Sequence, residues 1–289
     1  PEVSNTIENP FRHGQLSLFS RRRTGKQLAR NGYTHAYVLP NSLKSALVPW
    51  FAGIATRTGY TGEMRYGLLT DRRTLDTQRL PLMVERFAWL GQRAEAELER
   101  PVSNPRLTVE PDEFSETCKQ LDLAIPDRLA CFCPGAEYGP AKRWPAEYFA
   151  DLAGQLTDRG FTVWLLGSAS DRPVGEDITR SSGNTATNLC GLTNLDQAIT
   201  ILSAAKLAVT NDSGLMHVAA ALDRPTIAIY GSSSPAFTPP LSDAARVVKT
   251  EIDCSPCFAR KCPLGHFACM KKLDPATVAG HILSLEIDG

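Results

Sequence analysis

The sequence predicts an α/β protein built from two domains, each a parallel sheet covered by helices. Two observations support this class. Short apolar runs bounded by glycine or polar turn residues alternate with stretches of helical periodicity, and 289 residues are enough for two domains. Hydrophobic residues make up 43% of the chain and charged residues 21%, which is an ordinary globular composition.

The first predicted domain spans residues 1–105 and alternates helix with strand. Its elements are expected as a helix near 26–30, a strand at 35–39, a helix over 42–52 and a helix over 80–90. Residues 101–111 are rich in proline, asparagine and serine, which is typical of a linker, so the domain boundary is placed there.

The second predicted domain, residues 106–289, repeats the alternation more regularly. Strands are expected at 129–132, 161–166, 207–209 and 226–230, and helices at 146–159, 195–204 and 215–222. Apolar runs of this kind, bounded by polar turns, are typical of a parallel sheet that is buried on both faces.

The charge balance excludes one large class of partner. Lysine and arginine total 31, as do aspartate and glutamate, so no overall field favours nucleic acid and none is expected as a partner. No apolar run approaches the roughly 20 residues that span a bilayer, and the start of the chain lacks a signal-peptide pattern. A cytoplasmic location is therefore predicted.

The segment from Thr210 to Ala221 joins a predicted strand to a predicted helix. Asp212 or Ser213 can cap that helix, and Gly214 lets a ligand approach the backbone. A helix start presents free N–H groups to an anion. An ordinary strand-to-helix turn uses the same residue types, so the segment alone leaves a purely structural role open.

A second loop strengthens the functional interpretation. It follows the predicted strand at 129–132, and its Gly135 and Gly139 permit tight turns while Lys142 and Arg143 supply cations. Phosphate groups are recognised by this combination of glycine-rich backbone, cations and a helix start.

Together these loops resemble glycosyltransferase family 9, the heptosyltransferases, and most closely its heptosyltransferase II group. The motifs that carry the resemblance are, in order, YVLPNSLKSA at 37–46, GEMRYGLL at 62–69, PGAEYGPAKRWP at 134–145, TNDSGLMHVAAA at 210–221, YGSSSP at 230–235 and FTPP at 237–240. The resemblance therefore covers nearly the whole chain.

The resemblance implies a GT-B architecture, with two Rossmann-like doubly wound domains facing a cleft and the first domain incomplete. It implies an inverting transfer of L-glycero-D-manno-heptose from ADP-heptose to heptose I of the lipopolysaccharide inner core in a Gram-negative cell. The expected partners are ADP-heptose, a lipid A–Kdo–heptose acceptor and, peripherally, the cytoplasmic face of the inner membrane. No cofactor is required for such a transfer.

The resemblance also implies roles for individual residues. Lys142 would stabilise the departing diphosphate, Asp212 would contact heptose hydroxyls and His217 would lie near the phosphates. The donor-binding residues expected in this way are Gly135, Ala136, Lys142, Gly167, Ser168, Asp171, Asp212, Ser213, Gly214 and His217. Asp171 is expected to reach a ribose hydroxyl. A helix N-cap remains open for Asp212, and a packed histidine for His217.

The acceptor side is expected in the first domain, where polar and basic residues follow the predicted strand at 35–39. The residues that would face a phosphorylated inner core are Asn41, Ser42, Lys44, Arg57 and Arg65. The family begins with an apolar strand and a G-D-x-x-M loop, whereas this chain opens at Pro1 in what resembles the middle of that domain. The family's general base is therefore expected to be absent from the chain.

Two alternatives remain open at this level. Another family 9 heptosyltransferase, either heptosyltransferase I or a later enzyme, would carry similar donor loops. A catalytically impaired nucleotide-sugar-binding protein would keep the donor site without transfer.

The eight cysteines form two groups. Cys118, Cys131, Cys133 and Cys190 lie in apolar or helical contexts and are expected to be buried. The other four, Cys254, Cys257, Cys262 and Cys269, have a density that resembles a structural zinc or iron–sulfur site. Free thiols or local disulfides remain open for them, and no catalytic metal is predicted.

Overall fold

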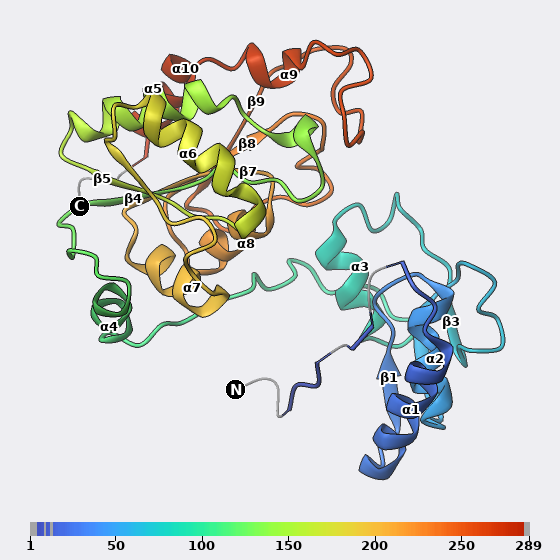
Figure 1. The fold of residues 1–289 in the computed structure, drawn as a ribbon. Helices are drawn as coiled ribbons and strands as arrows, with labels where there is room; N and C mark the ends of the chain where they lie inside the picture. The colour runs from blue at the N-terminus through green and yellow to red at the C-terminus, as the bar shows by residue number, and fades with distance from the viewer. Residues whose placement is uncertain (1–4, 9, 12–13, 286–289) are drawn as a thin grey trace. The chain divides into compact units, whose positions relative to one another are not determined.

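A computed structural model of the chain describes residues 5–8, 10–11 and 14–285. It divides into two compact units, Pro1–Val102 and Ser103–Gly289 (Figure 1). Within the described residues, no helix is both long and apolar enough to cross a membrane.

The first unit holds a small parallel sheet with the strand order β1-β2-β3. Its elements are α1 (Leu18–Leu28), η1 (Ala29–Asn31), β1 (His35–Tyr37), α2 (Leu43–Phe51), β2 (Thr56–Tyr60), β3 (Asp71–Arg73) and α3 (Met83–Leu90). The helix expected near 26–30 is the end of α1 together with η1. The sequence interpretation missed β2 and β3, because their short polar runs lack a strand pattern.

The second unit is a six-stranded parallel sheet with the order β6-β5-β4-β7-β8-β9. Its strands are β4 (Leu129–Cys133), β5 (Thr162–Leu165), β6 (Ala186–Asn188), β7 (Leu207–Asn211), β8 (Thr226–Tyr230) and β9 (Ala245–Lys249). Its helices are α4 (Glu113–Gln120), η2 (Pro140–Lys142), α5 (Ala146–Thr157), η3 (Ala169–Asp171), α6 (Arg172–Ser181), α7 (Leu195–Ala204), α8 (Gly214–Ala221), α9 (Ala268–Lys271) and α10 (Pro275–Leu283). This strand order is that of a doubly wound nucleotide-binding domain.

Strand β4 shows why the sheet is buried on both faces. All five of its residues are buried, as its apolar sequence LACFC predicts. Ala130 and Phe132 pack in the core that contains α5, α6 and α10, whereas Leu129, Cys131 and Cys133 pack with α4, α7 and α8. Figure 1 shows these helices as two layers, one above and one below the sheet.

Strand β7 runs further than its apolar residues indicate. The sequence predicts a strand at 207–209, but the structure continues it through Thr210 and Asn211, both fully buried. Hydrogen bonds compensate the burial of the Asn211 amide, so a polar residue is accommodated inside the sheet.

Candidate functional site

The loops after β4 and β7 meet where the direction of the strand order reverses. β4 pairs with β5 on one side and with β7 on the other, so the connections from β4 and β7 leave toward opposite faces of the sheet. In doubly wound proteins this switch point opens a crevice at the carboxyl ends of the strands, where nucleotides bind. Both loops singled out in the sequence begin there.

Lys142 and Asp212 bring these two loops together. The Lys142 ammonium donates a hydrogen bond to the Asp212 carboxylate, with Nζ 2.5 Å from Oδ2. The side chains are 17% and 5% exposed, so the pair is largely withdrawn from water. The hydroxyl of Ser233, after β8, donates to the same carboxylate oxygen. These contacts hold the cation of η2 at the end of β7.

Asn211 fixes the geometry of both loops, and the sequence interpretation missed its role. Its side-chain amide donates to the carbonyl oxygen of Pro134 at 2.7 Å, and its Oδ1 accepts from the backbone N–H of Trp144 at 3.1 Å. The Trp144 indole is buried and donates to the carbonyl of Leu273. The segment between Pro134 and Trp144, which contains Lys142, is thus anchored at both ends. The motif at 210–221 contained Asn211, but nothing in the sequence distinguished it from a turn residue.

The start of α8 carries amides that its own cap residue does not satisfy. Ser213 occupies the N-cap position with extended backbone but makes no side-chain hydrogen bond to the helix. Of the two residues expected as possible caps, Asp212 or Ser213, the structure places Ser213 at the N-cap position without a side-chain capping bond. Asp212 is occupied by Lys142 and Ser233. Gly214 begins the helix and is exposed, so the first turn is open to an anion.

His217 lies one turn into α8 on a solvent-exposed position. Desolvation by the surrounding protein lowers the pKa of its imidazole, Lys142 lowers it further and Asp212 opposes the effect. The imidazole is therefore held more strongly in its neutral form than an ordinary histidine, and the charges of Lys142 and Asp212 both act on it.

Gly135, Gly167, Ser168 and Asp171 also come together, at the adjacent ends of β4 and β5. The Asp171 carboxylate accepts from the backbone N–H of Ser168 at 3.0 Å and from its hydroxyl at 2.7 Å. Arg143 approaches the same carboxylate at 3.5 Å. The Oδ2 atom of Asp171 is therefore occupied within its own turn, whereas Oδ1 has, among the described residues, only the long contact to Arg143.

The close packing around Asp171 explains why Gly135 and Gly167 carry no side chain. A Cβ on Gly135 would come within 2.5 Å of an Asp171 carboxylate oxygen, and one on Gly167 would stand 3.0 Å from the Asp171 Cβ. Ala136 follows Gly135, is 3% exposed and accepts a backbone hydrogen bond from Gly139. The turn after β4 is consequently a compact backbone surface with no large side chain at Gly135 or Ala136.

In the first unit Arg65 is a structural residue. It is 2% exposed, and its guanidinium donates to the carbonyls of Tyr60 and Pro40 and to the side chain of Asn41. Burial lowers its pKa. Arg57 likewise donates to a backbone carbonyl of its own unit, at 2.6 Å. The expectation that Arg65 presents its charge to an acceptor phosphate is therefore replaced by a role in holding the loop after β1.

The remaining predicted acceptor residues lie around the start of α2. Asn41 is exposed, and Ser42 and Lys44 are partly exposed. The backbone N–H of Leu43 donates to the Glu63 carboxylate at 2.7 Å, so a carboxylate of the chain itself occupies this helix start. Lys44 adds a cation beside it.

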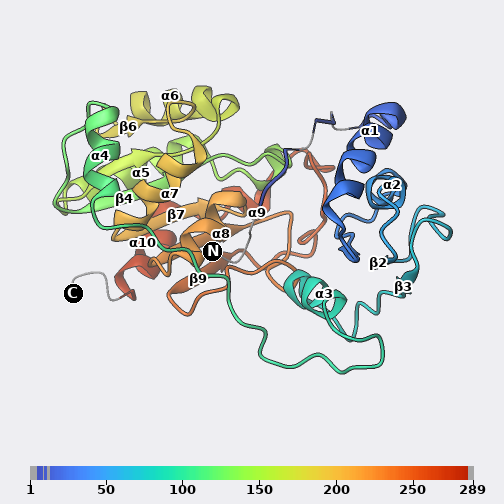
Figure 2. The same ribbon diagram turned by 90° about the horizontal axis from the view of Figure 1, so that it is seen from below.

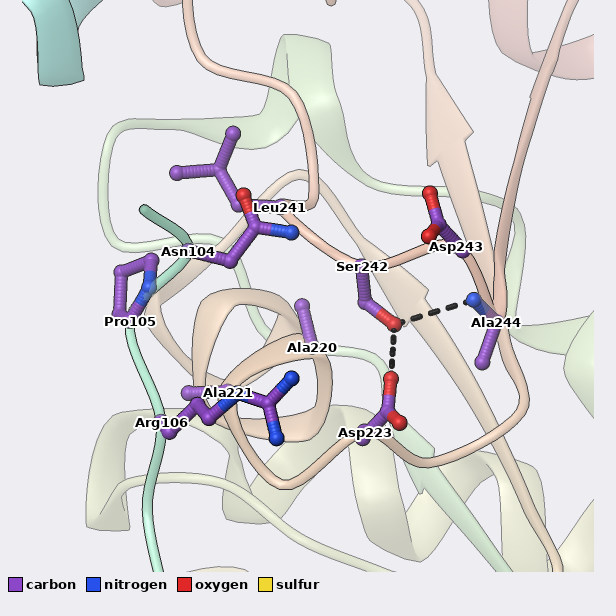
Figure 3. A pocket seen from close by; sticks show the side chains of 10 residues that line it. All are labelled: Asn104, Pro105, Arg106, Ala220, Ala221, Asp223, Leu241, Ser242, Asp243 and Ala244. Atoms are coloured by element: carbon purple, nitrogen blue, oxygen red, sulfur yellow. Dashed lines mark hydrogen bonds between the residues drawn. The ribbon is translucent and has the colours of Figure 1, made fainter. Parts of the chain in front are cut away.

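A hollow of about 160 Å³ lies away from the switch point. It is lined by the start of the second unit and by the residues that follow α8 and precede β9 (Figure 3). The Ser242 hydroxyl there donates to the Asp223 carboxylate at 2.6 Å and accepts from the Ala244 N–H at 3.1 Å. None of the predicted site residues lines this hollow.

The burial of the cysteines divides them into the same two groups that the sequence predicts. Cys118, Cys131, Cys133 and Cys190 are buried, which confirms the expectation for them. Four others, Cys254, Cys257, Cys262 and Cys269, are free thiols that line one small hollow. Within the described residues, no three His, Cys, Asp or Glu side chains are grouped so as to hold a metal ion. A structural metal at these thiols stays a prediction.

A doubly wound domain with a cation, a carboxylate and an open helix start at its switch point is typical of a nucleotide-binding α/β protein. The family description "Glycosyltransferase family 9 (heptosyltransferase)" matches residues 21–268. The chain belongs to this family.

Individual relatives agree with this assignment. The chain is 52% identical to lipopolysaccharide heptosyltransferase 2 of Escherichia coli strain K12 over 258 residues, which cover 86% of this chain and 74% of that protein. It is 46% identical to lipooligosaccharide heptosyltransferase 2 of Haemophilus influenzae over 260 residues, covering 86% and 75% respectively.

The fold of the chain also agrees with membership of this family. The structure of E. coli ADP-heptose lipopolysaccharide heptosyltransferase II superposes with a TM-score of 0.84 at 46% identity, covering 92% of this chain and 80% of that one. The predicted α/β class and its GT-B type are confirmed, as is the resemblance to family 9. The protein is an enzyme of the glycosyltransferase class.

Proposed function

We propose that the protein is an inverting glycosyltransferase that moves L-glycero-D-manno-heptose from ADP-heptose to heptose I of the lipopolysaccharide inner core. It acts at the cytoplasmic face of the inner membrane on a lipid A–Kdo–heptose acceptor. The observation that carries the proposal is the Lys142–Asp212 pair beside the open start of α8. The names of the relatives described above support the choice of sugar and acceptor.

The donor diphosphate occupies the switch point in this proposal. Its oxygens accept from the first amides of α8 near Ser213 and Gly214 and from the Lys142 ammonium. Gly135 and Ala136 leave room for the phosphates beside the backbone, because neither carries a large side chain. The adenosine lies toward the ends of β5 and β6, where Gly167, Ser168 and Asp171 follow.

The chemistry requires stabilisation of the leaving group. As the bond between sugar and diphosphate breaks, negative charge grows on the departing ADP while the sugar becomes oxocarbenium-like. Lys142 meets that charge from a fixed position, since η2 is anchored through Asn211 and the ammonium is held by Asp212. Asp212 is also proposed to contact heptose hydroxyls, and His217 to contact the phosphates.

Inversion follows from direct attack by the acceptor hydroxyl on the face of the sugar opposite the leaving ADP. A general base assists that attack by removing the hydroxyl proton. We assign no residue of this chain as that base. Asn41, Ser42 and Lys44 are proposed to lie on the acceptor side. Protein groups supply the charge stabilisation in this mechanism, so it needs no cofactor.

The test is release of ADP from ADP-heptose with an acceptor that carries lipid A, Kdo and one heptose. Acceptor-dependent ADP release with one heptose added to the product supports the proposal. Transfer to an acceptor that lacks heptose instead would identify a heptosyltransferase I activity. ADP binding without transfer to either acceptor would reject transferase function for this chain and favour a nucleotide-sugar-binding role.

A further inference from the structure

The segment between β9 and α9 holds three of the four unassigned thiols, Cys254, Cys257 and Cys262, and is tied to the candidate site on two sides. Toward the end of β8, the N–H of Phe258 donates to the carbonyl of Ser232 at 2.6 Å, and the Ser255 hydroxyl donates to the carbonyl of Gly231 at 2.7 Å. These bonds fix the segment at the carboxyl edge of the sheet. Figures 1 and 2 show it beside the loop that follows β4.

The same segment contacts the loop that carries Lys142. The Tyr138 hydroxyl donates to the carbonyl of Phe258 at 2.8 Å, and the N–H of Ala141 donates to the carbonyl of Arg260 at 3.1 Å. A Cβ on Gly139 would come within 2.4 Å of that Arg260 carbonyl, so glycine is needed for the two backbones to approach. The backbone of Arg260 is therefore fixed directly against η2.

Arg260 and Lys142 share one aromatic ring. The Arg260 guanidinium carbon lies 5.2 Å from the centre of the Tyr138 ring, and the Lys142 nitrogen lies 5.1 Å from the same point. Both distances are within the range of cation–π contacts. The Tyr138 ring thus contacts both cations after the end of β4.

The charges of this region are unevenly compensated. Lys142 is paired with Asp212, and Arg143 with Asp171. Arg260 is exposed, and in residues 5–8, 10–11 and 14–285 no ion pair to a carboxylate is recorded for its guanidinium. The Arg260 guanidinium is therefore available to an anionic ligand, and the ring that it stacks on also contacts Lys142 of the candidate donor site.

We propose that Arg260 is a second diphosphate-binding residue of the donor site, acting beside Lys142. This assignment rests on the proposed function and deepens it, because it names a group that nothing in the site motifs indicated. The planar guanidinium can donate two parallel hydrogen bonds to phosphate oxygens, which the Lys142 ammonium cannot do. Stacking on Tyr138 restricts the side chain before the ligand arrives, which lowers the entropy cost of binding.

The proposal also gives the cysteine-bearing segment a purpose. Arg260 lies between Cys257 and Cys262, so the fold of this segment positions the Arg260 guanidinium near the proposed diphosphate site. The thiols themselves need not contact the ligand. They line a small hollow to which Ala141 and Ser232 also contribute.

The test compares Arg260→Ala with Lys261→Ala, a matched control that removes the neighbouring exposed cation. Binding of ADP to the full chain is measured by calorimetry, and binding of adenosine by its displacement of ADP. Arg260→Ala should weaken ADP binding about tenfold and leave adenosine within about twofold, since a charge-assisted phosphate contact is lost. Lys261→Ala should leave both within about twofold, and Arg260→Lys should restore ADP binding in part.

The outcomes separate this assignment from the proposed function. ADP binding that Arg260→Ala leaves unchanged, or that Lys261→Ala weakens equally, overturns the role of Arg260 alone. An equal loss for ADP and adenosine also overturns it, because that result indicates a disturbed loop and not a lost phosphate contact. A parent chain that binds no ADP overturns the proposed donor site and this assignment together. Thermal unfolding of each variant confirms that the exposed side chain is not needed for folding.

Discussion

Replacement of Lys142 by methionine is the perturbation that tests the candidate site most directly. The ammonium lies 2.5 Å from the Asp212 carboxylate, and the two side chains are only 17% and 5% exposed. Methionine keeps much of the volume of the side chain while it removes the charge and all three N–H donors. Two separate quantities should change.

The first quantity is the rate of transfer. Removing one fixed donor that stabilises developing charge costs roughly 10²–10³ in kcat, or about 3–4 kcal/mol. We therefore expect Lys142→Met to lower kcat for acceptor-dependent ADP release by that factor. The exposed lysine of α4 provides a control, because Lys119→Met should leave kcat within about twofold.

The second quantity is the free energy of unfolding. Without Lys142, the Asp212 carboxylate stays buried with the Ser233 hydroxyl as a hydrogen-bond donor, and breaking a buried pair costs on the order of 3 kcal/mol. Adding Asp212→Asn to Lys142→Met should recover much of that stability, since no unpaired charge remains buried. It should not recover kcat. Urea unfolding and the ADP-release assay measure the two effects on the same samples.

One result would refute the reasoning about catalysis. If Lys142→Met is folded at the assay temperature and keeps kcat within about threefold of the parent chain, the ammonium does not stabilise the leaving group. If the double variant regains both stability and kcat, the loss in the single variant came from the buried carboxylate alone.

Three further predictions follow from the geometry. Gly135→Ala should raise the KM for ADP-heptose and lower stability by about 1–3 kcal/mol, because its Cβ would meet the buried Asp171 carboxylate at 2.5 Å; unchanged KM and urea midpoint would contradict this. Burial lowers the pKa of His217 in the free protein, and the negative charge of a diphosphate bound beside it should raise that pKa, so that binding takes up protons. ADP affinity should therefore rise as the pH falls from about 8 to 6. His217→Asn should remove this pH dependence. Thiol reagents should modify Cys262 early in the native protein, because backbone N–H groups, led by that of Phe267, lower the pKa of its thiol. Cys131 is buried and its pKa is raised, so it should react only after unfolding. Mass spectrometry of timed samples checks this order, and modification of Cys131 before Cys262 would contradict it.

Much of the second unit follows from its sequence. Runs such as LACFC at 129–133 are apolar at every position, and only a strand buried on both faces accommodates them. The loops at 134–145 and 210–221 could be placed at strand ends, since a helical pattern follows each apolar run. Those two facts were enough to predict the fold class and to locate two loops as candidate ligand-binding segments; the roles of individual donor residues came from the family resemblance and stay a prediction. The motifs of these two loops carried the family resemblance, which the comparisons confirmed.

Other features needed the tertiary structure because they depend on contacts between residues distant in sequence. Asn211 joins Pro134 to Trp144 across two strands, and its position in the chain gave no sign of this. Arg65 is of a residue type that often binds anions, but its guanidinium donates hydrogen bonds to the carbonyls of Pro40 and Tyr60 and so holds the loop after β1. Ser213 had the sequence of a helix cap and makes no capping bond.

The sequence by itself determined the approximate positions of the apolar strands of the second unit and which residue types follow them, because backbone periodicity and turn chemistry are local properties. Only the tertiary structure decided which of those side chains are satisfied by the protein and which stay available to a ligand. The Arg65 guanidinium is occupied by the carbonyl of Pro40, and Arg143 approaches the Asp171 carboxylate from the loop after β4, whereas the start of α8 is left without a side-chain cap. Hydrogen-bond partners and burial arise from packing across the chain, so local sequence cannot specify them.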